Sequence, residues 1–167
     1  MQAFSVLAEQ LPPGAPPVEL TVFGGAAMVL LFGARESTKD VDAFCLRPES
    51  EGTVREAAAV VAATLGLPGD WLNDAVKGYV HGLAFGQLIV STPTLRVRTA
   101  SVEQLLAMKL SAWRDDVDVE DARRLLEECA GTREEIWGRV AGHLVPGREL
   151  KSRYAFDDLW ESDRGSA

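Results

Sequence analysis

Apolar residues recur at helical spacing near the start of the chain and at alternating positions soon afterwards. The helical spacing spans residues 4–11, with apolar side chains at Phe4, Leu7, Ala8 and Leu11. This helix must end at Pro12-Pro13, because proline supplies no N–H and cannot continue it. The alternating positions of residues 18–23 predict a strand, and Gly24-Gly25 follows directly and opens an apolar helix over residues 26–31. A strand, a glycine pair and a helix are therefore expected without a gap.

The middle of the chain repeats both patterns. Residues 40–46 predict a second strand, and residues 51–65 predict a helix that ends at Gly66. This helix carries apolar side chains at helical spacing, at Val54, Ala58, Val61 and Leu65. Residues 70–74 predict a loop, and residues 88–90 and 95–97 predict two strands joined by a turn. Together the strands form a small sheet.

The last third of the chain is predicted to be helical. Ser101 and Gln104 match a capping box, in which each side chain satisfies a backbone N–H at the start of a helix, and Thr132 and Glu135 repeat this pattern. A helix over residues 119–129 and a final short helix from Gly147 through residue 160 complete the prediction. The fold class is therefore α+β. With 167 residues we expect a single domain, with a core at about 18–126 and a helical extension at about 130–160.

Net charge limits the partners that the chain can attract. The formal net charge is -8 and the isoelectric point is near 4.8, so the overall field repels phosphate backbones. Arg96 and Arg98 come nearest to a local basic patch. Nonspecific binding of nucleic acid is therefore not expected.

Two features indicate a reducing compartment without a membrane anchor. Cys45 and Cys129 fall within a predicted strand and a predicted helix, with no metal-ligand spacing between them, which predicts buried free thiols. The longest apolar stretch, residues 26–32, is far too short to cross a bilayer. We expect a cytoplasmic protein.

The strongest chemical signal is the pair Asp40 and Asp42. Side chains two apart on a strand project to the same face, so the two carboxylates should converge. Carboxylates held this close repel each other unless a cation lies between them, and their hard oxygen atoms suit Mg²⁺ (or Mn²⁺). The alternative is an acidic pair in a turn or at an exposed strand end.

Gly24-Gly25 stands where a strand leads into a helix. Bare backbone N–H groups and the positive end of the helix dipole can receive phosphate oxygens at such a position. The alternative is a pair of glycines that serves only a turn or helix packing.

The succession of strand, Gly-Gly, apolar helix and Arg35-x-x-Thr38-x-Asp40-x-Asp42 resembles the nucleotidyltransferase superfamily, whose catalytic domain is shared with DNA polymerase β. The resemblance implies a small mixed sheet flanked by helices. It also implies that Gly24 and Gly25 hold a triphosphate, with Arg35 and Thr38 in the same nucleotide site, and that Asp40 and Asp42 bind metal ions. Arg35 is either an electrostatic brace for the two acids or an exposed cation at a helix end.

The resemblance continues in residues 105–112 and in Asp118-x-x-Asp121, which look like the bacterial abortive-infection and toxin–antitoxin branch. It implies that Lys109 contacts the nucleotide phosphates, and that Asp118 or Asp121 is a further metal ligand or the base for the attacking hydroxyl. The alternatives are a surface lysine whose stem lies along apolar residues, and acids that only complement a helix dipole.

Other residues fit the resemblance less well. Many superfamily members carry a third carboxylate on the next strand, whereas residues 87–98 contain no Asp or Glu. Trp71-Leu72-Asn73-Asp74 and Lys77 look like a recurrent segment of small members of this group. Trp71 could stack on a base, but packing in the core is favoured. Lys77 could reach a phosphate, but a solvated side chain is favoured. His81 and His143 stand apart from any ligand cluster.

These patterns predict Mg²⁺-dependent transfer of a nucleotide from a nucleoside triphosphate to an acceptor hydroxyl on an RNA end, a protein or a small molecule. The branch also suggests a toxin–antitoxin system with a cognate partner protein. The alternative is a degenerate transferase fold that serves as a binding module, an antitoxin or a partner-recognition subunit, and the missing strand carboxylate favours this alternative.

Overall fold

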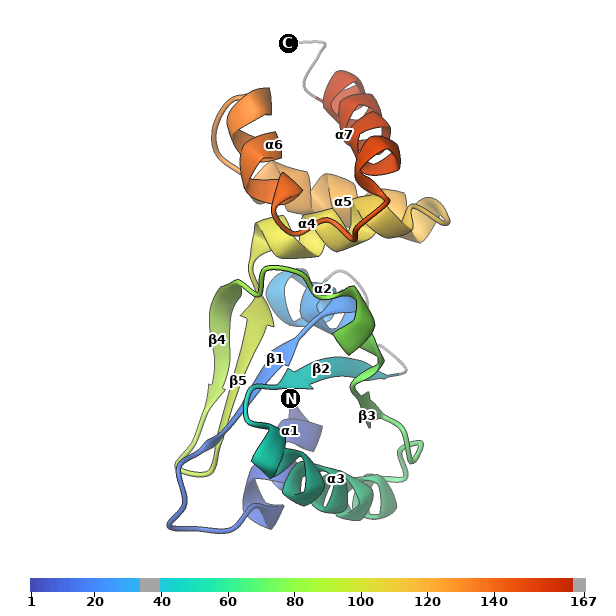
Figure 1. Ribbon diagram of the computed structural model, residues 1–167. Helices are drawn as coiled ribbons and strands as arrows, with labels where there is room; N and C mark the ends of the chain where they lie inside the picture. Colours follow the sequence, from blue (N-terminus) through green and yellow to red (C-terminus); the bar gives the residue numbers. More distant parts are fainter. Residues whose placement is uncertain (34–39, 164–167) are drawn as a thin grey trace. The chain divides into compact units, whose positions relative to one another are not determined.

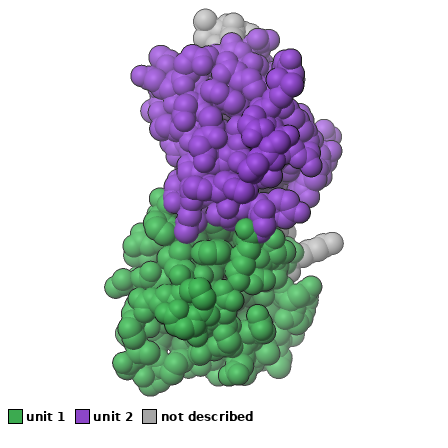
Figure 2. Space-filling model, viewed as in Figure 1, with its two compact units in different colours: residues 1–77, 85–99 green, residues 78–84, 100–167 purple. Residues whose placement is uncertain are grey.

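The computed structural model describes residues 1–33 and 40–163 (Figure 1). It divides into two compact units, coloured separately in Figure 2. Unit 1 comprises residues 1–77 and 85–99, and unit 2 comprises residues 78–84 and 100–167. The expectation of a single domain stays a prediction.

Unit 1 is built on a mixed sheet in the order β3-β2-β1-β5-β4 (Figure 1). The strands are β1 (Val18–Val22), β2 (Val41–Cys45), β3 (Leu72–Asn73), β4 (Phe85–Ser91) and β5 (Leu95–Ala100). Strand β1 pairs antiparallel with β2 and parallel with β5, while β2 and β3 run parallel. The predicted α+β class with a small mixed sheet is confirmed.

Three helices and two 3₁₀ turns accompany this sheet. They are α1 (Gln2–Gln10), α2 (Gly24–Phe32), α3 (Glu51–Leu65), η1 (Pro48–Ser50) and η2 (Ala75–Tyr79). Helices α1 and α3 pack together, and the Trp71 indole fills the space beside them, with its Nε1–H donating to the Ala58 carbonyl over 3.0 Å. The Phe4 ring meets the Trp71 ring edge-on at 6.3 Å, which confirms the predicted packing role of Trp71.

Unit 2 contains four helices, α4 (Val102–Ala112), α5 (Asp116–Glu128), α6 (Arg133–Ala141) and α7 (Glu149–Asp163). Helix α4 packs against the other three. Their shared core is formed by fully buried apolar side chains, among them Leu106, Leu110, Leu125, Ile136 and Phe156. Burial of such side chains is the main source of stability in a helical unit of this size.

The two predicted capping boxes have different outcomes. Thr132 and Glu135 form both reciprocal hydrogen bonds at the start of α6. Ser101 accepts the Gln104 N–H at the start of α4, but the reciprocal bond predicted for Gln104 is wrong. The buried Gln104 amide instead accepts from the Ala84 N–H and donates to the His81 carbonyl, and so satisfies two backbone groups of residues 78–84.

The element boundaries agree with the periodicity where the elements are long. The helix predicted over residues 51–65 is confirmed as α3. The two strands predicted at 88–90 and 95–97 are present as β4 and β5, and both are longer than predicted. The predicted loop at 70–74 was wrong in part, because it contains β3.

Cys45 and Cys129 are free and buried, as predicted. Within residues 1–33 and 40–163, no helix combines the length and the apolar character needed to cross a membrane.

Candidate functional site

Gly24 and Asp42 lie side by side where β1 leads into α2. The antiparallel register pairs Val22 with Ala43, and the Phe23 N–H donates to the Asp42 carbonyl over 2.9 Å, one step beyond the last paired residues. The end of β1 therefore meets the start of β2, and the first residue of α2 falls directly beside the Asp42 side chain.

Only glycine suits this position, for two reasons. Gly24 has a φ of 57°, a left-handed conformation that side chains disfavour. A Cβ atom at Gly24 would also lie 3.1 Å from Asp42 Oδ2, which is closer than such atoms normally approach. The backbone of Gly24 therefore lies directly beside the Asp42 carboxylate.

The start of α2 has no side-chain cap from its N-cap residue. Phe23 is the N-cap residue and forms no side-chain cap, so no side chain of that residue satisfies the first N–H groups of the helix. Gly25, the second residue of α2, presents no side chain either. Free N–H groups at a helix N-terminus, together with the helix dipole, favour a phosphate.

Asp40 and Asp42 are close enough to interact electrostatically. Asp40 is exposed immediately before β2, and Asp42 is half-buried within it. Burial and, next, the negative charge of Asp40 raise the pKa of Asp42, while a hydrogen bond from the Asn73 side chain opposes this rise. A divalent cation between the carboxylates would remove the repulsion.

The donor set fits magnesium better than a metal held by protein ligands alone. Among the described residues, no group of three or more His, Cys, Asp or Glu side chains could hold a metal ion. Mg²⁺ is commonly bound by one or two carboxylates, with substrate phosphates and waters completing its shell. Asp40 and Asp42 beside an open helix N-terminus match this arrangement.

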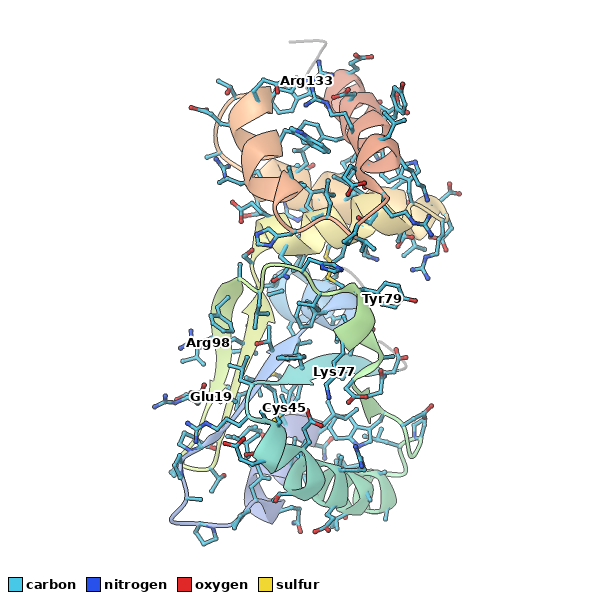
Figure 3. All side chains as sticks on the ribbon, in the orientation of Figure 1. Glu19, Cys45, Lys77, Tyr79, Arg98 and Arg133 are labelled. Atoms are coloured by element: carbon cyan, nitrogen blue, oxygen red, sulfur yellow. The ribbon has the colours of Figure 1, made fainter. Side chains whose placement is uncertain are left out.

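An arginine lies on the same face of the sheet as Asp42, within residues 87–98, where the resemblance led us to expect a third acid. Thr21 pairs in register with Phe44 of β2 and with Arg98 of β5, so these three side chains share one face of the sheet. Asp42 lies two residues before Phe44 and shares that face. Arg98, labelled in Figure 3, therefore lies on the Asp42 face with the opposite charge to the expected acid.

Three further predicted site residues come together in unit 2. Lys109 Nζ lies 3.0 Å from Asp118 Oδ1 and 2.7 Å from Asp121 Oδ2. The Arg114 Nε–H donates to Asp118 Oδ2 over 3.0 Å, so two cations compensate two acids. All but Arg114 are buried or nearly so, with side-chain exposures of 13%, 2% and 5% for Lys109, Asp118 and Asp121.

The cations of this cluster lower the pKa of Asp118. Burial alone would raise the pKa of Asp118, but hydrogen bonds from Arg114 and Lys109 outweigh it and lower that pKa to about 2. Lys109 is thus an ion-paired residue rather than a surface lysine. A direct contact of Lys109, Asp118 or Asp121 with a substrate stays a prediction.

Lys77 is also paired rather than simply solvated. Its Nζ lies 2.7 Å from Glu51 Oε1 and 2.7 Å from Asp74 Oδ2. These residues border a pocket of about 110 Å³ that residues of β2 and α3 line, Cys45 among them. Figure 3 labels Lys77 and Cys45. Lys77 is therefore already neutralised by two acids, whereas Arg55, which also lines the pocket, is exposed.

The structure adds Asn73 to the candidate site. Asn73 pairs in register with Asp42 and opposes the rise in the pKa of its carboxyl group. The sequence signal for this role was the Trp71-Leu72-Asn73-Asp74 segment itself, which stood out without a function. Arg35 and Thr38 lie outside the described residues. His143 Nδ1 lies 3.1 Å from the His81 carbonyl.

Comparison with known proteins assigns the chain to a family. The family described as nucleotidyltransferase of unknown function (DUF6036) matches residues 1–128, which include the glycine pair, both acids, Lys109 and the acids of α5. No curated protein and no solved structure gives a significant match. The chain therefore belongs to this family of nucleotidyltransferases of unknown function.

Proposed function

We propose that the protein transfers a nucleotide from a nucleoside triphosphate to an acceptor hydroxyl, with Mg²⁺ or Mn²⁺ as cofactor. One observation supports this proposal above all: Asp42 Oδ2 lies so close to the start of α2 that a Cβ at Gly24 would be only 3.1 Å away. A carboxylate for a cation and an open helix N-terminus for phosphates are thereby combined in one place.

Each residue of this site has a distinct part in the proposed reaction. The backbone N–H groups of Gly24 and Gly25 orient the β- and γ-phosphates, and Asp40 and Asp42 hold the divalent cation. When bound, the cation supplies charge neutralisation at the α-phosphate. The acceptor oxygen then attacks the α-phosphorus in line, and pyrophosphate leaves. Catalysis of this kind consists mainly of positioning and electrostatic stabilisation.

The remaining predicted residues belong to a secondary part of the proposal. Arg35 and Thr38 would extend the nucleotide site. Lys109 would offset phosphate charge, and Asp118 or Asp121 would bind metal or accept the hydroxyl proton. The ion pairs within unit 2 supply a competing structural role for these three residues, because Lys109 and Arg114 already compensate the charges of Asp118 and Asp121.

The acidic character of the chain favours one group of acceptors. A net charge of -8 opposes the approach of a polyanion, so a protein or a small-molecule hydroxyl fits better than an RNA end. A toxin–antitoxin role with a cognate partner rests on the resemblance alone.

The test is a transfer assay with the full chain, each of the four nucleoside triphosphates labelled at the α-phosphate, Mg²⁺ or Mn²⁺, and cell extract. Label should appear on an acceptor, which mass spectrometry then identifies. Asp42→Asn should lower transfer by at least 100-fold, since it removes a ligand of the proposed metal. Asp70→Asn is the matched control, because Asp70 is an exposed carboxylate of the same unit. Full transfer by an Asp40→Asn, Asp42→Asn double variant would refute the mechanism.

A second function is favoured by Arg98. With arginine on the sheet face where an acid is expected, the domain could bind a metal–triphosphate complex without turning it over, as a partner-recognition module. Calorimetry separates the two functions: tight binding of ATP with Mg²⁺, without label transfer to any acceptor, supports the module.

A further inference from the structure

The segment Trp71-Leu72-Asn73-Asp74 is fixed to the rest of unit 1 at its beginning. Trp71 is 3% exposed, and its indole N–H donates to the Ala58 carbonyl in α3. Its own carbonyl accepts from the Val41 N–H over 2.6 Å, which starts the parallel pairing of β2 and β3. The two-residue strand β3 therefore has a fixed register against β2.

The segment is fixed at its other end by charge. The Asp74 carboxylate lies 2.7 Å from Lys77 Nζ, and Lys77 reaches Glu51 at the start of α3. The Asp74 carbonyl also accepts the Lys77 N–H over 3.0 Å. Together, the indole anchor and the ion pairs hold both ends of a short segment that would otherwise be too short to form a stable strand.

Asn73 lies between these anchors and faces Asp42. The register pairs the two residues, so their side chains share one face of the sheet. The Asn73 Oδ1 accepts the Ala75 N–H over 3.1 Å. Because an amide has one acceptor end and one donor end, this bond leaves the Asn73 NH₂ group available as a donor beside the Asp42 carboxylate, whose pKa Asn73 acts to lower.

We infer that Asn73 is a positioning residue, which orients the Asp42 carboxylate toward the divalent cation of the proposed function. The inference rests on that function. One oxygen held by a neutral amide leaves the other oxygen for the cation, and an amide does not repel a cation as a lysine would. Residues that hydrogen-bond metal ligands in this way typically contribute 10- to 100-fold to metal affinity.

The test measures Mn²⁺ binding by electron paramagnetic resonance of the free ion, with the full chain and with ATP present. Asn73→Leu preserves size and removes the donor, and it should weaken Mn²⁺ binding by about tenfold. Asn73→Ser, which is too short to bridge Asp42 and Ala75, should weaken it to a similar extent and replaces the leucine variant if that variant fails to fold. Gln87→Leu is the matched control, since it changes an exposed amide to leucine on β4, the opposite edge strand.

The thermal midpoint in EDTA separates positioning from a structural role. For positioning, at least one Asn73 variant should keep the wild-type midpoint while its Mn²⁺ affinity falls. Unchanged Mn²⁺ affinity in both Asn73 variants, with binding lost in Asp42→Asn, would overturn the inference and leave the proposed function intact. Wild-type protein that binds no Mn²⁺ even with ATP would overturn both.

Discussion

Gly24 combines two local constraints in one residue. Its left-handed φ lets α2 begin immediately after β1, and its missing side chain leaves room for Asp42 Oδ2. Either constraint alone would favour glycine in a purely structural turn. Their combination beside a carboxylate is what makes the turn a candidate phosphate site.

Gly24→Ala should therefore lower both stability and triphosphate binding. The left-handed conformation costs a non-glycine residue about 1–2 kcal/mol, and the new methyl group must displace the Asp42 carboxylate. Urea unfolding measures the first effect, and calorimetry with ATP and Mn²⁺ measures the second.

Gly52→Ala is the control for this change. Gly52 lies within α3, with open space around its missing side chain, so alanine there should stabilise the protein by about 0.5–1 kcal/mol. Destabilisation of equal size by both substitutions would contradict the argument.

Which site residues the sequence could predict depends on how far apart the interacting residues lie. Asp40, Asp42 and Gly24 belong to one strand–turn–helix succession, so spacing alone suggests their proximity. The contact of Asn73 with Asp42 depends on the parallel pairing of β2 with β3, and a two-residue strand has no periodicity to reveal it. Likewise, the partners of Lys109 lie on the next helix, and its sequence position indicated only that its charge needs compensation.

At the scale of elements, the two capping motifs show how tertiary contacts override a local signal. Thr132 and Glu135 are exposed, so nothing competes for their hydrogen bonds. Gln104 is completely buried, and residues 78–84 use its amide instead. The sequence predicted where both helices start, but not which capping partner each helix uses.

Thr132→Ala should destabilise α6 by about 1 kcal/mol, because it removes the acceptor for the Glu135 N–H and one partner of the Glu135 carboxylate. Chemical denaturation followed by circular dichroism measures this loss.

Thr64→Ala is the matched control, because Thr64 is exposed in α3 and its hydroxyl donates only to the Val60 carbonyl within the same helix. Alanine there should leave stability unchanged or raise it slightly. An equal loss in both variants would exclude capping as the cause.

At the scale of the whole molecule, acidic residues outnumber basic ones, although the buried acids Asp118 and Asp121 are paired with cations. The chain has 25 acidic residues against 17 lysines and arginines, yet its buried acids Asp118 and Asp121 contact cations. The negative surplus therefore lies at the surface, where solvent and salt screen it. Acid sensitivity should consequently depend on the few buried pairs rather than on the total charge.

The pKa of Asp118 predicts in which pH range the protein loses stability. Its pKa of about 2 in the folded protein lies below the ordinary value of 3.8, so the unfolded chain binds the proton more tightly. Its contribution, about 2 kcal/mol, is fully present above pH 5 and is lost as the pH falls from about 4 to about 2. Urea unfolding from pH 2 to pH 7, followed by tryptophan fluorescence, should record this loss.

Asp118→Asn should abolish that pH-dependent component. The variant should be less stable than wild type at pH 7 and should approach it near pH 2, because both proteins then carry a neutral group at this position. Asp116→Asn, an exposed acid in the same first turn of α5, should instead follow the wild-type curve at a nearly constant offset. If the Asp118→Asn curve also ran parallel to wild type, the ion pairs of Asp118 with Lys109 and Arg114 would contribute no net stability, and Lys109 would be held in unit 2 by its ion pair with Asp121.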